Sequence, residues 1–142
     1  MNSPSLDSNE NSAEQVTIEL SAAVAQAFQQ AHEFFKTGQW AQAQASYEQV
    51  LKEVPQLEPA ALQWVRCLVL QGLQMQAREG FAQLLKNFPN NYSAWLEAGH
   101  LCRQQAQHQQ AQVCYAKAIG LVPDLFEARL SMARLLEDLG QF

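Results

Sequence analysis

The chain has 142 residues, of which 48% are hydrophobic and 16% are charged, and its formal net charge is −5. This length and composition suit one folded domain with a buried core. The charge is uneven, because from residue 21 onward 10 acidic residues face 9 basic ones. Such a nearly neutral body lacks the dense basic patch that binding to a phosphate backbone requires, so we expect no nucleic-acid partner.

The three cysteines, Cys67, Cys102 and Cys114, are odd in number and form no CxxC pair. A disulfide framework or a zinc site needs close, paired spacing, so we expect free thiols in a reducing compartment. The N-terminus lacks the basic and apolar regions of a secretory signal, and no apolar run approaches the roughly 18 residues that span a bilayer. We therefore expect a cytoplasmic protein without a membrane partner.

The chain opens on a polar segment of Ser, Asn, Asp and Glu. We expect residues 1–15 to form a disordered acidic tail, because this composition buries too little apolar surface to offset the entropy of ordering. The folded region then spans residues 16–142. Ser12 and Gln15 have the spacing of a helix-capping box, which predicts a first helix from near residue 13 to about Lys36.

The rest of the chain alternates between helix and short turn. Apolar residues recur at helical spacing in six further segments. The sequence contains few of the β-branched runs and alternating patterns that are typical of strands. An all-α fold is therefore predicted. In chain order, the six further helices are expected at 40–54, 58–70, 74–87, 92–104, 108–121 and 126–138.

These helices belong to a repeat with a period of 34 residues. Prolines, alanines, large aromatic residues and two apolar positions each recur at this spacing, which indicates a repeat architecture of helical hairpins. Glycine stands where the first helix of a hairpin ends, and proline stands where the second helix ends. The rows are Pro55, Pro89 and Pro123; Ala43, Ala77 and Ala111; Tyr47, Phe81 and Tyr115; Val50, Leu84 and Ala118; Leu51, Leu85 and Ile119; and the turn glycines Gly38, Gly72 and Gly140.

This pattern resembles the tetratricopeptide repeat (TPR), whose signature carries Trp, Leu-Gly, Tyr, Gly, Ala, Phe or Tyr, Ala and Pro at fixed places. The resemblance implies a right-handed α-solenoid of antiparallel helix hairpins, the TPR superhelix. Trp95 and Gly99 match the signature. Val65 replaces a small residue, and Ala106 replaces the turn glycine, so we expect a different or strained turn there. The resemblance covers repeats 24–57, 58–91 and 92–125 and a partial repeat 126–142.

The fourth repeat stops at residues 140–142, whose Gly-Gln-Phe matches the Gly-Gln-Trp of residues 38–40 and would lead into a second helix. End repeats normally carry a polar cap. We therefore expect either the N-terminal part of a longer protein or a homodimer formed through the open C-terminal end. The apolar residues that would need cover there are Met132, Leu135, Leu136 and Leu139.

No cluster of polar residues in the sequence has the spacing of a catalytic or metal site. His100 and Cys102 stand two apart and would lie on different faces of a helix, and the adjacent Glu137 and Asp138 are typical of a solvated helix end. Neither a phosphate-binding glycine loop nor a hydrolase, kinase or zinc-protease motif is present. We expect this segment to have no enzyme activity, no metal and no cofactor.

The TPR resemblance also implies a groove lined by the first helix of each hairpin, at the second, fifth, ninth, twelfth and thirteenth positions of the repeat. The fifth position is apolar and the ninth is His or Arg throughout, and the two share a helix face. Two alternatives stay open, namely that the apolar residues pack against the neighbouring helix and that the His and Arg residues are simply solvated. The eight predicted groove residues are Phe28, His32, Leu62, Arg66, Leu96, His100, Leu130 and Arg134.

An apolar row beside a basic row favours a partner peptide or helix with apolar anchors and nearby carboxylates, which arginine binds with two donors. The sequence therefore predicts a protein–protein interaction scaffold. TPR proteins that grip a C-terminal carboxylate carry Lys and Asn where this chain has Phe28 and His32, so a chaperone-tail receptor is not predicted. The alternative function is the N-terminal, substrate-binding TPR region of a longer enzyme, such as a protein O-glycosyltransferase.

Overall fold

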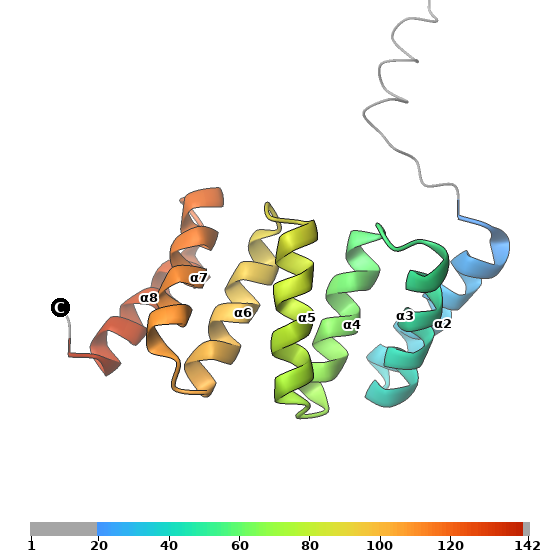
Figure 1. The fold of residues 1–142 in the computed structure, drawn as a ribbon, viewed down its shortest axis with the longest axis horizontal. Helices are drawn as coiled ribbons and strands as arrows, with labels where there is room; N and C mark the ends of the chain where they lie inside the picture. Colours follow the sequence, from blue (N-terminus) through green and yellow to red (C-terminus); the bar gives the residue numbers. More distant parts are fainter. Residues whose placement is uncertain (1–19, 141–142) are drawn as a thin grey trace, which may run out of the picture.

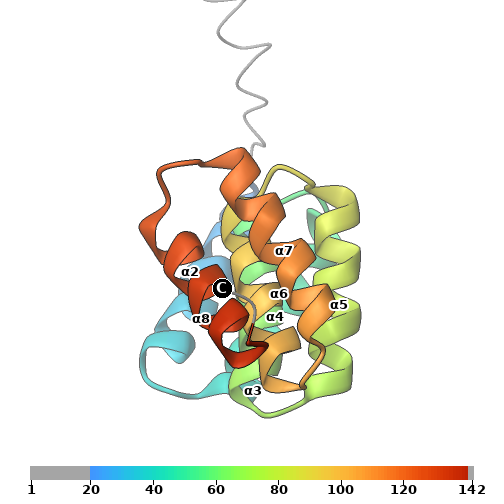
Figure 2. The same ribbon diagram turned by 90° about the vertical axis from the view of Figure 1, so that its left-hand side faces the viewer.

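The computed structural model describes residues 20–140, which form seven α-helices joined by short turns and contain no strand. The all-α prediction is confirmed, and each of the six helices expected from residue 40 onward lies within one residue of its predicted bounds. Figure 1 shows the helices side by side in chain order, and Figure 2 views the row from the α8 end. The helices are α2 (Ala22–Lys36), α3 (Trp40–Glu53), α4 (Glu58–Leu70), α5 (Gln74–Asn87), α6 (Tyr92–Gln104), α7 (His108–Leu121) and α8 (Phe126–Asp138).

The first described helix, α2, begins later than predicted. Ser21 has extended backbone angles, φ −57° and ψ 154°, and its side chain accepts a hydrogen bond from the backbone N–H of Val24 at 3.2 Å. This is the geometry of an N-cap, which satisfies a donor that the helix itself leaves unpaired. A continuous helix from near residue 13 to Lys36 is therefore wrong, because the chain is extended at Ser21. The predicted tail and the Ser12 capping box lie outside the described residues.

Each first helix of a hairpin ends in a left-handed residue. Gly38 and Gly72 have φ values of +79° and +76°, and Ala106 adopts the same conformation with φ +60°. The chain closes both kinds of turn alike, since Gln39 N–H donates to the Phe34 carbonyl at 2.9 Å and Gln107 N–H donates to the Cys102 carbonyl at 2.8 Å. A left-handed non-glycine residue costs roughly 1–2 kcal/mol. The strained turn predicted at Ala106 is confirmed.

In the second and third hairpins, the two helices approach closely where one of them carries a glycine. In the third hairpin, a Cβ added to Gly99 on α6 would lie 2.6 Å from the Tyr115 ring on α7. In the second hairpin, Val65 on α4 fills the corresponding place, and the space is made on the partner helix instead. A Cβ on Gly80 of α5 would lie 3.0 Å from Val65 Cγ2. Gly80 therefore accommodates the departure at Val65, and the hairpin is kept.

The core follows the repeat rows predicted from the sequence. The alanine and aromatic rows are buried, with at most 3% of any of these side chains exposed. Small alanines let the helix backbones approach, and the aromatic rings one turn later fill the space beside them. These buried residues are Ala43, Ala77, Ala111, Tyr47, Phe81 and Tyr115.

Among residues 20–140, no helix combines the length and the apolar character needed to cross a membrane.

Candidate functional site

The apolar row of predicted groove residues is unevenly exposed. Leu96 is only 6% exposed and belongs to the buried core between α6, α7 and α8. Phe28 and Leu62 are half-buried against the core, and the Phe28 ring packs edge-on against Tyr47 at 5.9 Å between ring centroids. Leu130 is the exposed member of the row, at 36%. Packing between helices thus accounts for the apolar character of Leu96 and, in part, for that of Phe28 and Leu62.

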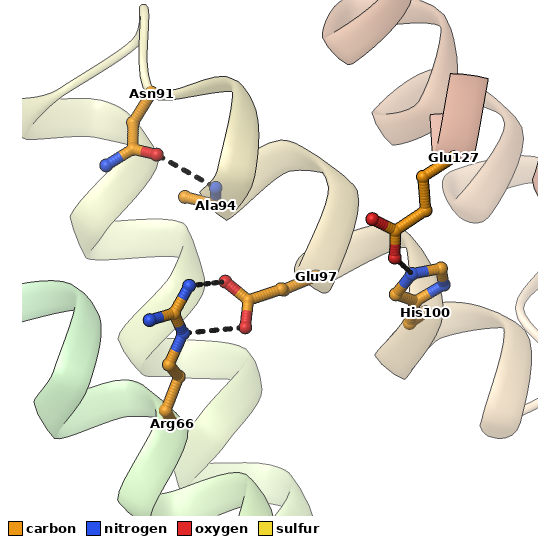
Figure 3. Close-up of polar contacts among 6 residues, drawn as sticks. All are labelled: Arg66, Asn91, Ala94, Glu97, His100 and Glu127. Carbon is orange, nitrogen blue, oxygen red and sulfur yellow. Dashed lines mark hydrogen bonds and ion pairs between the residues drawn. The ribbon is translucent and has the colours of Figure 1, made fainter. Parts of the chain in front are cut away.

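The basic row begins with Arg66 on α4, whose guanidinium is already bound within the chain. Its Nε and one Nη donate to the two carboxylate oxygens of Glu97 on α6, at 2.7 and 3.0 Å (Figure 3). Both side chains are about one-third exposed, at 32% and 30%. Two parallel charge-assisted bonds fix the guanidinium in one orientation. The pair connects the first helices of the second and third hairpins.

His100 is held on both sides of its ring. Its Nδ1 lies 2.9 Å from the Tyr115 hydroxyl on α7. On the other side of the ring, Nε2 lies 3.7 Å from a carboxylate oxygen of Glu127 on α8 (Figure 3). The side chain of Glu127 is 67% exposed, so it stays accessible to solvent. The contact to Glu127 is an ion pair when the imidazole is protonated. His100 therefore links the third hairpin to α8.

Arg103 on α6 makes a further link, with its Nη 2.7 Å from Asp138 on α8. Within residues 20–140, the remaining two members of the basic row, His32 and Arg134, form no ion pair and are exposed. The basic row is thus divided. Its inner members are paired with acidic residues of the next repeat, and its outer members are open to solvent.

A pocket of about 420 Å³ lies on the same helices, beside Arg66 and His100. Its apolar wall includes Val69 and Leu70, which occupy the twelfth and thirteenth positions of the second repeat, and Leu70 is 47% exposed. Exposed leucine next to a concave surface is a common feature of a binding site. The full lining is Phe35, Arg66, Val69, Leu70, Phe81, Glu97, His100, Leu101 and Gln104. We call this the groove pocket.

The acidic partners and the exposed leucine of this site were not predicted from the sequence. Glu127 stands at the second position of its repeat and Leu70 at the thirteenth, both of which the resemblance marked as facing the groove, yet only the fifth and ninth positions were assigned residues. Glu97 stands at the sixth position of its repeat, which is not one of the positions that the TPR resemblance assigns to the groove. A comparison of the ninth position with acidic residues of the next repeat is the signal that would have found it.

The C-terminal end of the row is better covered than predicted. Leu135 is fully buried in the core, and Met132, Leu136 and Leu139 are half-buried. The large apolar side chains of α8 that are exposed are instead Phe126, at 74%, and Leu130, at 36%. Self-association through this end stays a prediction. No group of three or more potential metal ligands exists among the described residues.

Comparison with known proteins agrees with the repeat geometry. Two family models, each described as tetratricopeptide repeat, match residues 34–99 and 92–125. No curated protein matches the chain.

Similar solved structures share the fold at low sequence identity. The first TPR of Spaghetti (RPAP3) bound to the HSP90 peptide SRMEEVD has a TM-score of 0.77 at 14% identity and covers 87% of this chain and 99% of its own. The Arabidopsis OM64 TPR domain has a TM-score of 0.76 at 17% identity, over 82% and 96% of the two chains. MamA has a TM-score of 0.77 at 14% identity, over 93% and 74%. The helical hairpins, their turn residues and the family matches agree, and the chain belongs to the tetratricopeptide repeat family.

Proposed function

We propose that this chain is a protein–protein interaction scaffold that binds a polypeptide segment of a partner along α2, α4, α6 and α8. The observation that carries the proposal is the groove pocket, which accepts an apolar anchor side chain of that segment. The pocket lies on the face that the resemblance assigns to ligands, and two predicted groove residues, Arg66 and His100, line it.

The pocket is suited to an apolar side chain because of what lines it. Phe35, Val69, Leu70 and Leu101 supply apolar wall from three first helices, α2, α4 and α6. Full burial of a Leu or Phe side chain contributes about 1.5–3 kcal/mol. A pocket of this volume has room for one such side chain and part of its backbone. Polar groups of Glu97 and Gln104 at its wall offer hydrogen bonds to the backbone of the bound segment.

In this proposal, the carboxylates predicted on the partner bind at the two ends of the groove. The donors of Arg66 are taken by Glu97, so a partner carboxylate would have to displace a two-bond internal pair. Arg134 on α8 and His32 on α2 are exposed and remain available. The bound segment therefore places its apolar anchor centrally and its acidic residues over α8 or α2.

The comparison with RPAP3 supports peptide binding by this fold, because that TPR is bound to a peptide of HSP90. At 14% identity it supports no choice of partner. Phe28 and His32 still stand where carboxylate-gripping TPR proteins carry Lys and Asn, and Phe28 packs on Tyr47. The proposed partner is therefore a segment with an apolar anchor rather than a free C-terminal tail.

A selection from a random peptide display library on the immobilised protein tests the proposal. Leu70→Asp places a charge in the groove pocket, whereas Met75→Asp makes the same kind of change at a site that is 79% exposed and outside the pocket. We expect the selected peptides to share an apolar residue. Their affinity for Leu70→Asp should be at least tenfold lower, which corresponds to about 1.4 kcal/mol. They should bind Met75→Asp as they bind the unchanged protein. Selected peptides that bind all three proteins equally would refute the groove pocket as the site.

A further inference from the structure

A second pocket, of about 340 Å³, lies among α5, α6 and α7 and contains two thiols. Cys102 on α6 and Cys114 on α7 both line it and are half-buried, and Arg78 of α5 stands at the same pocket. Both thiols line this one pocket, so the two side chains face the same cavity. The pocket is open enough at its rim to leave Val113 56% exposed.

The packing of the third hairpin explains why these two residues meet. Gly99 lets α7 approach α6 until the Tyr115 ring fills the space where a Cβ would stand. Cys102 is three residues after Gly99 and so lies on the same side of α6, one turn along. Cys114 directly precedes Tyr115. Figure 1 shows α6 and α7 side by side. The close approach that the glycine allows therefore brings the thiols together.

We propose that Cys102 and Cys114 form a redox-active dithiol, which a small peroxide such as hydrogen peroxide converts into an intramolecular disulfide between α6 and α7. The two pockets share Phe81 and Leu101, but both thiols line only the second pocket. The proposal therefore does not require a polypeptide bound at the groove pocket.

The reaction proceeds in two steps. The Cys102 thiolate attacks one oxygen of hydrogen peroxide, the O–O bond breaks, and the departing hydroxide takes up the thiol proton as water, which leaves a sulfenic acid on Cys102. The Cys114 sulfur then attacks the Cys102 sulfur, the S–O bond breaks, and the hydroxyl leaves with the Cys114 proton as a second water. Two thiols have lost two hydrogen atoms, and one peroxide has been reduced to two waters.

The surroundings of the two thiols set this order. Burial raises the pKa of both, to about 12 for Cys114, while the neighbouring Cys114 side chain and the Arg78 guanidinium oppose the rise for Cys102. The thiolate is the attacking species, so Cys102 reacts first and Cys114 resolves the sulfenic acid. Cys67 is fully buried in a different core cluster, away from this pocket. Cys67 serves as an internal control, because it is also a thiol but does not line the pocket that holds the other two.

Trypsin separates the three cysteines, because it cleaves after Lys and Arg. Cys67 falls in peptide 67–78, Cys102 in 87–103 and Cys114 in 104–117. The intact chain is treated with hydrogen peroxide at low protein concentration, alkylated, and digested without reduction. We expect a linked species of peptides 87–103 and 104–117 that lacks two hydrogen atoms, with peptide 67–78 alkylated on a free thiol. Unlinked peptides 87–103 and 104–117, or links that involve peptide 67–78, would overturn the proposal.

Three serine variants give the test its controls. Cys67→Ser retains the link, whereas Cys102→Ser and Cys114→Ser each lose it, and circular dichroism checks that all three stay helical. In Cys114→Ser, the sulfenic acid on Cys102 has no resolving thiol and is trapped by dimedone. Dimedone labelling of Cys114 in Cys102→Ser that is as fast as that of Cys102 in Cys114→Ser would refute the order of attack.

Discussion

The guanidinium of Arg66 on α4 donates two hydrogen bonds to the carboxylate of Glu97 on α6, at 2.7 and 3.0 Å. The two residues are 31 positions apart in the chain and belong to successive repeats. Their pair and the contacts of α6 with Glu127 and Asp138 connect the first helices of neighbouring hairpins directly. In a repeat protein, such interfaces between neighbours carry much of the cooperativity of folding.

A double-mutant cycle measures this coupling. Arg66→Met with Glu97→Gln should show an interaction free energy of about 1–2 kcal/mol in urea unfolding, because the pair is two-thirds buried and held by two charge-assisted bonds. The same cycle on the pair of Lys36 and Glu33, which is about 60% exposed at 59% and 61%, should give less than about 0.5 kcal/mol. Equal coupling energies for the two pairs would mean that the link between α4 and α6 adds nothing beyond a surface ion pair.

The left-handed turn at Ala106 predicts a stabilising substitution. Ala106→Gly should raise the free energy of unfolding by about 1 kcal/mol, because glycine adopts φ +60° without the steric cost that alanine has. Gly72→Ala, at φ +76°, should lower it by a similar amount. Urea titrations of the two variants check both signs, and a loss of stability in Ala106→Gly would contradict the strain assigned to the turn.

Two glycines inside helices should respond in opposite directions to alanine. Gly99→Ala should destabilise the chain by about 1–3 kcal/mol, because its Cβ would lie 2.6 Å from the Tyr115 ring. Gly120→Ala on α7 meets no atom within 4 Å and should stabilise by about 0.5–1 kcal/mol through helix propensity. Thermal unfolding of both variants decides the matter, and a harmless Gly99→Ala would show that α6 and α7 are not in close contact.

Alkaline pH should weaken the fold in a way that depends on Cys67. Burial raises the pKa of its thiol from the ordinary 9.0 to about 11. The folded state therefore holds this proton to higher pH than the unfolded state, so the stability that it contributes is complete below pH 9 and is lost as the pH rises through 11. Cys67→Ala should lose less stability over this interval, by up to roughly 2–3 kcal/mol. The measurement is urea unfolding at a series of pH values, and parallel curves for the two proteins would rule the linkage out.

Charge reversal at the open end of the basic row tests which partners the groove prefers. Arg134→Glu should weaken binding of acidic selected peptides by about 1–2 kcal/mol, because it replaces an exposed cation on α8 with an anion. Lys117→Glu makes the same change of charge on α7 and should leave affinity nearly unchanged. Isothermal titration calorimetry at low salt compares the two. Equal losses would indicate attraction by net charge instead of a local contact.

The helices, their turns and the strained residue at Ala106 were predictable because each depends on residues near one another in the sequence. The period of 34 residues also predicted which alanines and aromatics are buried. The start of α2 was not predictable, since Ser12 and Ser21 both have the chemistry of an N-cap and only the backbone at Ser21 decides between them.

The contents of the groove required the stacking of the repeats. Whether Arg66 stays open to a partner depends on where Glu97 lies, 31 residues later, and that is decided by the rotation from one repeat to the next. The same holds for Cys102 and Cys114, whose contact depends on how closely Gly99 lets two helices approach. The residues at one repeat position predict which residue types lie on a face of the stacked helices. They do not show which of the charged residues on that face are already paired within the chain.

Methyl-detected NMR of the chain with a selected apolar peptide tests the groove pocket most directly. The methyl resonances of Val69 and Leu70 should shift on addition of the peptide. Those of Met75 and of Val113, which lines the second pocket among α5, α6 and α7, should stay in place. Shifts at Val113 without shifts at Val69 and Leu70 would contradict the proposed site, because the polypeptide would then bind outside the groove pocket.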